Sequence, residues 1–85
     1  MASKRILKKN VNDMIIDIVE ECFTLQLFDE KKTKKTDALI DEAADFQDDI
    51  LTRINAAKNK ADFKSIRADI EAKAVQFVEK LNALN

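Results

Sequence analysis

The side chains that could do chemistry in this chain are carboxylates, lysines and one thiol, because the sequence contains no histidine. Histidine is the commonest acid–base group and metal ligand near neutral pH, so most familiar catalytic and metal sites lack their central residue. One segment carries four carboxylates at helical spacing: Asp37, Asp41, Asp45 and Asp48. It has neither the glycine-containing loop of a Ca²⁺ site nor the Glu-x-x-His pair of a di-iron site. We interpret these acids as a hydrated helix face and expect no metal.

The nucleophilic side chains are also poorly placed for catalysis. Cys22 lies among apolar residues at helical spacing and follows Glu20 and Glu21, which predicts a buried and unreactive thiol. Ser3 and Ser65 stand in no recognisable catalytic motif, and the chain has no glycine-rich loop that could bind a phosphate. We therefore expect no catalytic activity, no cofactor and no small-molecule substrate.

Cations gather at the start of the chain and recur near the second predicted turn. The first four would oppose the dipole at the N-terminus of the first helix, which an anionic partner such as RNA would explain. No aromatic residue alternates with them for base stacking, and the net charge is only −1, so a solvated cationic end is the favoured interpretation. The candidate anion-binding residues are Lys4, Arg5, Lys8, Lys9, Lys58 and Lys64.

The elements that carry these side chains are predicted to be long helices, because the chain also lacks glycine and proline. Apolar residues recur at steps of three and four in three segments, about residues 3–30, 36–58 and 60–84. Ser3, Thr36 and Asn59 are candidate N-caps, with Asp62 completing a capping box after Asn59. Residues 1–85 therefore form one all-α domain, an up-down-up three-helix bundle, or a helical hairpin completed by a second copy.

The expected core consists of one apolar stripe on each helix. The first stripe is Leu7, Val11, Met14, Ile18, Cys22 and Leu25. The second is Leu39, Ala43, Phe46, Ile50, Ile54 and Ala57. The third is Phe63, Ile66, Ile70, Ala74, Phe77, Leu81 and Leu84.

The first helix is more apolar than one face of a three-helix core requires, since ten of the fifteen residues from Met14 to Phe28 are hydrophobic. A rotation of about 100° per residue places a second stripe nearly opposite the first. Either the helix is covered on two sides within the bundle, with Phe23 under another helix, or the stripe is exposed and pairs with a second copy or a partner groove. We favour the exposed patch, whose candidate interface residues are Ile16, Val19, Phe23 and Leu27.

The chain opens with Lys4-Arg5-x-Leu7-Lys8-Lys9-x-Val11-Asn12 and continues into an apolar helix with Glu21-Cys22 at its middle. This pattern resembles a group of short, uncharacterised all-helical proteins from Bacteroidales bacteria. The resemblance covers about the first 25 residues and implies an intracellular bacterial origin, with no activity and no site residue to transfer.

The sequence as a whole predicts an interaction or scaffold module that is not an enzyme. Acidic residues interrupt the first apolar stretch, which argues against a signal peptide and a membrane span, so we expect a cytoplasmic protein. We expect it to form a homodimer or to bind another protein. The alternative function is an anion-binding or RNA-binding module that uses the cationic end.

Overall fold

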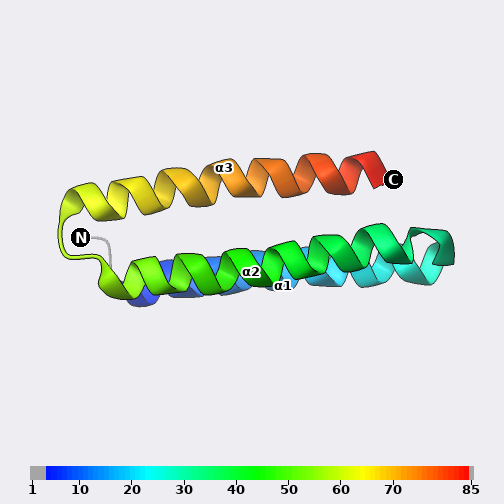
Figure 1. Ribbon diagram of the computed structural model, residues 1–85, viewed down its shortest axis with the longest axis horizontal. Helices are drawn as coiled ribbons and strands as arrows, with labels where there is room; N and C mark the ends of the chain where they lie inside the picture. Colours follow the sequence, from blue (N-terminus) through cyan, green and yellow to red (C-terminus); the bar gives the residue numbers. More distant parts are fainter. Residues whose placement is uncertain (1–3, 85) are drawn as a thin grey trace.

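The computed structural model describes residues 4–84, which form three long helices and one short 3₁₀ turn. The elements are α1 (Lys4–Phe28), η1 (Glu30–Lys32), α2 (Thr33–Ala56) and α3 (Lys60–Leu84). The helices run up, down and up, so α1 and α3 are parallel and α2 is antiparallel to both (Figure 1). The bundle measures 45 × 17 × 17 Å. The predicted all-α three-helix bundle is therefore confirmed.

The first turn lies earlier in the chain than the sequence pattern predicted. Asp29 adopts an extended backbone, and its carboxylate accepts a hydrogen bond of 3.0 Å from the amide of Lys31, which starts η1. As a result α2 begins at Thr33, and Lys34 and Lys35 lie inside its first turns instead of in a loop. The prediction of Thr36 as the N-cap is wrong.

Thr36 is instead a fully buried residue of α2. Its hydroxyl lies 3.1 Å from the carbonyl of Lys32 and 3.0 Å from that of Thr33, so it can donate to either. It also accepts a hydrogen bond of 2.7 Å from Nε2 of Gln26 on α1. The hydroxyl is the one polar atom of this side chain, and it has hydrogen-bond partners. These partners offset the cost of burying it.

The second turn follows the predicted pattern. The side chain of Asn59 accepts a hydrogen bond of 3.0 Å from the amide of Asp62, which confirms Asn59 as the N-cap of α3. The carboxylate of Asp62 accepts from the amide of Lys58, one residue before the cap, so the reciprocal bond of the capping box is shifted by one position. The third predicted cap, Ser3, lies outside the described residues.

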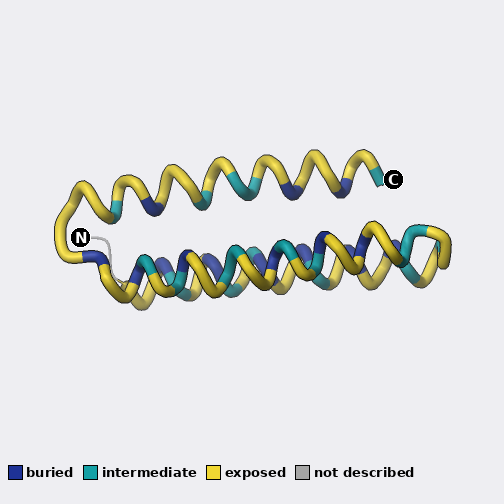
Figure 2. Tube along the Cα trace, viewed as in Figure 1, coloured by how far each residue is buried: buried dark blue, intermediate teal, exposed yellow. Residues whose placement is uncertain are grey.

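The core runs along the bundle axis and is formed by the three predicted stripes (Figure 2). On α1, Ile15 is buried and Met14 is only partly buried. On α3, Ala74 is only partly buried and lies outside the core cluster. Phe46, Phe63, Ile70 and Leu84 also pack against the core from partly exposed positions. Some members of the core are completely or almost completely enclosed: Val11, Cys22, Ala43, Ile50, Ile54 and Phe77.

The three helices do not pack equally closely. α1 and α2 approach each other along their whole length, whereas α3 makes fewer close contacts with both. Hydrogen bonds fix the register of the α1–α2 pair, from Gln47 to Asn12 at 2.8 Å and from Gln26 to Thr36 at 2.7 Å. On α3, only Ile66, Phe77 and Leu81 are fully buried. The molecule is therefore a tight helical hairpin with a third helix laid more loosely against it.

Candidate functional site

The rear face of α1, defined as Ile16, Val19, Phe23 and Leu27, is the first candidate surface. The side chains of Ile16, Phe23 and Leu27 are 52%, 53% and 86% exposed. Val19 is partly buried and packs against the core, so it lies between the exposed stripe and the interior. The alternative in which Phe23 is covered by another helix of the same chain is wrong.

The cationic end of the bundle is the second candidate surface. The up-down-up topology brings the start of α1, the end of α2 and the start of α3 to the same end of the molecule (Figure 1). Lys8 is partly buried, and the remaining candidates for anion binding are exposed: Lys4, Arg5, Lys9, Lys58 and Lys64. Binding of an anion or RNA at this end stays a prediction.

Two cations near this end already have partners within the chain. Nζ of Lys4 donates a hydrogen bond of 2.9 Å to the carbonyl of Asn55 near the C-terminus of α2, where a positive charge suits the helix dipole. Arg53 pairs with Asp69 on α3 and donates to the hydroxyl of Ser65. Asp69 therefore neutralises the charge of Arg53. The carboxylate of Asp62, in contrast, accepts a hydrogen bond from the backbone amide of Lys58. The ion pair between Arg53 and Asp69 therefore reduces the positive charge that is free to bind a ligand.

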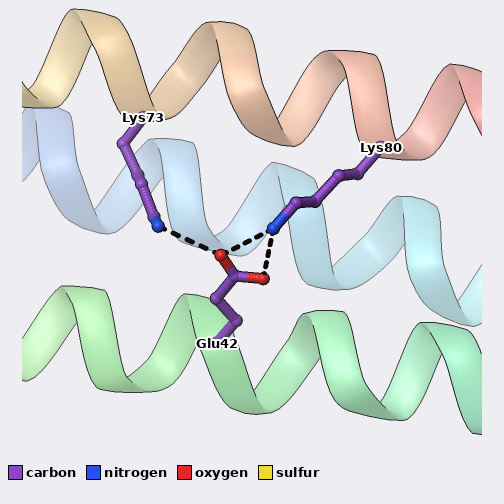
Figure 3. Close-up of polar contacts among 3 residues, drawn as sticks. All are labelled: Glu42, Lys73 and Lys80. Atoms are coloured by element: carbon purple, nitrogen blue, oxygen red, sulfur yellow. Dashed lines mark hydrogen bonds and ion pairs between the residues drawn. The ribbon is translucent and has the colours of Figure 1, made fainter.

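A cluster of three charged residues joins α2 to α3 (Figure 3). Oε1 of Glu42 lies 3.0 Å from Nζ of Lys73, and Oε2 lies 2.7 Å from Nζ of Lys80. Nζ of Lys73 also lies 5.5 Å from the ring centroid of Phe77 and 6.0 Å from that of Phe46. Sequence reasoning missed this cluster, because Glu42 lies between Asp41 and Asp45 in the segment that was interpreted as a hydrated acidic face. The available signal was the helical spacing of Glu42, three residues after Leu39 and four before Phe46, both of which belong to the core stripe.

The two lysines change the acidity of the central carboxylate. Hydrogen bonds from Lys80 and then Lys73 lower the pKa of Glu42 below its ordinary value of 4.5, and they outweigh the opposing effect of partial burial. At a pH between the lowered pKa and the ordinary one, Glu42 therefore binds fewer protons in the folded state than in the unfolded chain. The resulting stabilisation is complete above pH 4.5 and declines as the pH falls through the lowered folded-state value.

We expect Glu42→Gln to lower the free energy of unfolding by about 0.5–1 kcal/mol at neutral pH, because it removes the ion pairs with Lys73 and Lys80. The effect is small because all three side chains are partly exposed and solvent screens the pairs. Urea unfolding at pH 7 and at acidic pH would measure the effect. The difference between the variant and the wild type should shrink at acidic pH, where Glu42 becomes protonated. Glu79→Gln, at an exposed position of α3, is the control. A difference that is independent of pH would contradict the ion-pair account.

Cys22 and the acids of α2 differ in burial. Cys22 is fully enclosed, and burial followed by the charges of Glu21 and Asp37 raises the pKa of its thiol. The predicted buried cysteine is therefore confirmed. On α2, Asp41, Asp45 and Asp48 are exposed. Among residues 4–84, no group of three carboxylates and thiols is close enough to hold a metal ion.

Two further observations complete the description of the surface. Within residues 4–84, none of the helices combines the length and the apolar character that a membrane span needs. The charged residues of α1 end at Glu21, and the exposed apolar side chains of Phe23 and Leu27 follow them. Comparison of the chain with protein-family models, with curated proteins and with solved structures finds no match.

Proposed function

We propose that this protein is a non-catalytic interaction module that pairs with a second copy of itself through the rear face of α1. The observation that carries the proposal is the exposure of Ile16, Phe23 and Leu27 on one stripe of one helix. Large apolar side chains scattered over a surface are ordinary, but a continuous stripe marks an interaction site. A twofold axis across α1 would bury the same stripe of both chains against each other.

The amount of exposed surface supports the same proposal. The accessible surface is 5985 Å². A compact monomer of this mass, 9.7 kDa, would expose roughly 5,100 Å². The elongated bundle thus exposes roughly 900 Å² more than a compact protein of its size, and a stable interface buries roughly 800 Å² from each partner. Pairing would offset the modest burial that a small single chain achieves.

We expect Phe23→Glu to halve the molar mass of the protein in solution, because pairing would bury this new charge without a partner. Sedimentation equilibrium over a concentration series at high salt would measure the mass. Association through apolar side chains persists under these conditions, whereas contacts that depend on the cationic end are screened. The matched control is Val75→Glu, since Val75 lies on α3 and is 57% exposed, close to the exposure of Phe23.

Two results would contradict the proposed pairing. One is a wild-type protein that stays monomeric across the whole concentration series. The other is an equal loss of mass in Phe23→Glu and Val75→Glu, which would show that the added charge acts through net charge and not through the rear face of α1. Circular dichroism of both variants would confirm that the helices persist, as expected for substitutions at exposed positions.

A further inference from the structure

A groove between α1 and α3 is separate from both surfaces described above. It has a volume of about 500 Å³ and runs along the outer side of the seam between these two parallel helices. From Asn10 to Glu21 it spans about three helical turns, or roughly 16 Å at 1.5 Å per residue. The apolar residues that line it are Met14, Ile18, Ala74, Val78 and Leu81.

This seam differs from the other two in lacking polar bridges. Side-chain hydrogen bonds cross the α1–α2 seam, including the one between Gln47 and Asn12. Ion pairs cross the α2–α3 seam at Glu42 and at Arg53. Within the described part of the chain, no side-chain hydrogen bond or ion pair joins α1 to α3. The apolar residues of the groove are therefore not covered by polar side chains that bridge α1 and α3.

A row of carboxylates forms the α1 side of the groove. Asp13, Asp17 and Glu21 follow one another at four-residue intervals, so they lie on one line along the helix. All three are exposed, and none forms an ion pair with another residue in the range 4–84. Three like charges in such a row repel one another slightly, and a neighbouring cation would relieve the repulsion. The groove thus combines an apolar floor with one strongly negative edge.

We propose that this groove binds a cationic amphipathic helix of another protein. The apolar stripe of such a helix would cover the exposed side of Val78, which is 54% exposed, together with Met14. Lysine or arginine residues beside that stripe would reach the carboxylates of α1. An acidic helix or an anionic lipid surface would meet repulsion at the same edge, so charge selects the class of partner.

This inference does not depend on pairing through the rear face of α1. Asp13, Asp17 and Glu21 face the α3 side of α1, whereas Phe23 and Leu27 do not line the groove. A fourth helix in the groove and a second copy on the rear face would contact different sides of α1. The two proposals can therefore fail separately.

The experiment uses the full chain labelled with ¹⁵N and a synthetic helical peptide of leucine and lysine in an amphipathic pattern. We expect the peptide to shift the amide signals of residues 10–21 and 71–82, which flank the groove. Neutralising the row by Asp13→Asn, Asp17→Asn and Glu21→Gln together should weaken binding about tenfold. The control changes the same charge on α2 by Asp41→Asn, Asp45→Asn and Asp48→Asn, and it should leave binding nearly unchanged.

A second pair of variants tests the apolar floor. Val78→Glu should abolish peptide binding, while Val75→Glu, three residues earlier on the outer side of α3, should preserve it. Both valines are more than half exposed, at 54% and 57%, so both variants should fold. Phe23→Glu should bind the peptide as the wild type does, which distinguishes this groove from the rear face of α1.

Three outcomes would overturn the proposal. Equal weakening by the two triple variants would show attraction to net charge alone. Equal binding of a leucine–glutamate peptide would show that the carboxylates select nothing. A lower molar mass for Val78→Glu than for Val75→Glu would show that a second copy of this chain occupies the groove.

Discussion

Replacing Phe77 by alanine is expected to lower the free energy of unfolding by about 3–5 kcal/mol, since the side chain is fully enclosed and its removal leaves a cavity. The ring of Phe77 packs edge-on against Phe46 on α2, with 6.3 Å between centroids. Because α3 has few other fully buried residues, this contact is a main attachment of α3 to the hairpin. An 85-residue domain has a total stability of about 4–13 kcal/mol, so the loss is a large share of it.

Urea unfolding followed by circular dichroism would measure this effect. The control is Val75→Ala on the exposed side of the same helix, which should change stability by no more than about 0.5 kcal/mol. If α3 detaches before the hairpin unfolds, the variant will show two transitions or a reduced dependence on urea concentration. A loss below about 1 kcal/mol would mean that Phe77 does not hold α3 in place.

Enlarging Ala43 to leucine is expected to cost about 1–3 kcal/mol for the opposite reason, because the seam between α1 and α2 has no space for added atoms. Ala43 is fully buried, and the hydrogen-bonded register of the two helices places it level with Ile18. Ala44→Leu is the matched control, since the neighbouring alanine is exposed and leucine is also a good helix former.

The same urea titration separates the two cases. Ala43→Leu should lower the midpoint, while Ala44→Leu should leave it within about 0.5 kcal/mol of the wild type. An unchanged midpoint in both variants would show that the α1–α2 seam can widen without cost. Such a result would contradict the close packing that the structure assigns to this pair of helices.

The features that could be predicted from the sequence depend on the periodicity within one helix. The burial of Ile54 follows from its angular position, because a helix has a fixed rotation per residue. The same rotation places Phe23 opposite the core stripe, which favoured its exposure without excluding cover by another helix. The cap at Asn59 could be predicted because an amide side chain before Asp62 satisfies amide groups that any helix start leaves free. These interactions are local, so a single sequence contains them.

The features that were missed depend on how helices are placed relative to one another. Asp29 and Thr36 both have side chains that can cap a helix. In the structure Asp29 forms the turn, while the hydroxyl of Thr36 packs against Gln26 of the neighbouring helix, a contact that the sequence of α2 alone does not contain. The rotation of α3 about its own axis likewise decides that Lys73 reaches Glu42. That rotation also leaves the groove beside Asp17 open. Such distances between helices are not encoded in the periodicity of any one helix.

The unequal packing of the three helices has a consequence for the motions of this protein. Opening events in small proteins tend to release the element with the fewest enclosed contacts, at a smaller free energy than global unfolding requires. Here that element is α3, which the hairpin holds mainly through Ile66, Phe77 and Leu81. The amide protons of α3 should exchange with solvent through partial opening. Those of the buried residues of α1 and α2 should exchange only when the whole domain unfolds. We therefore expect α3 to open first and the hairpin of α1 and α2 to open last.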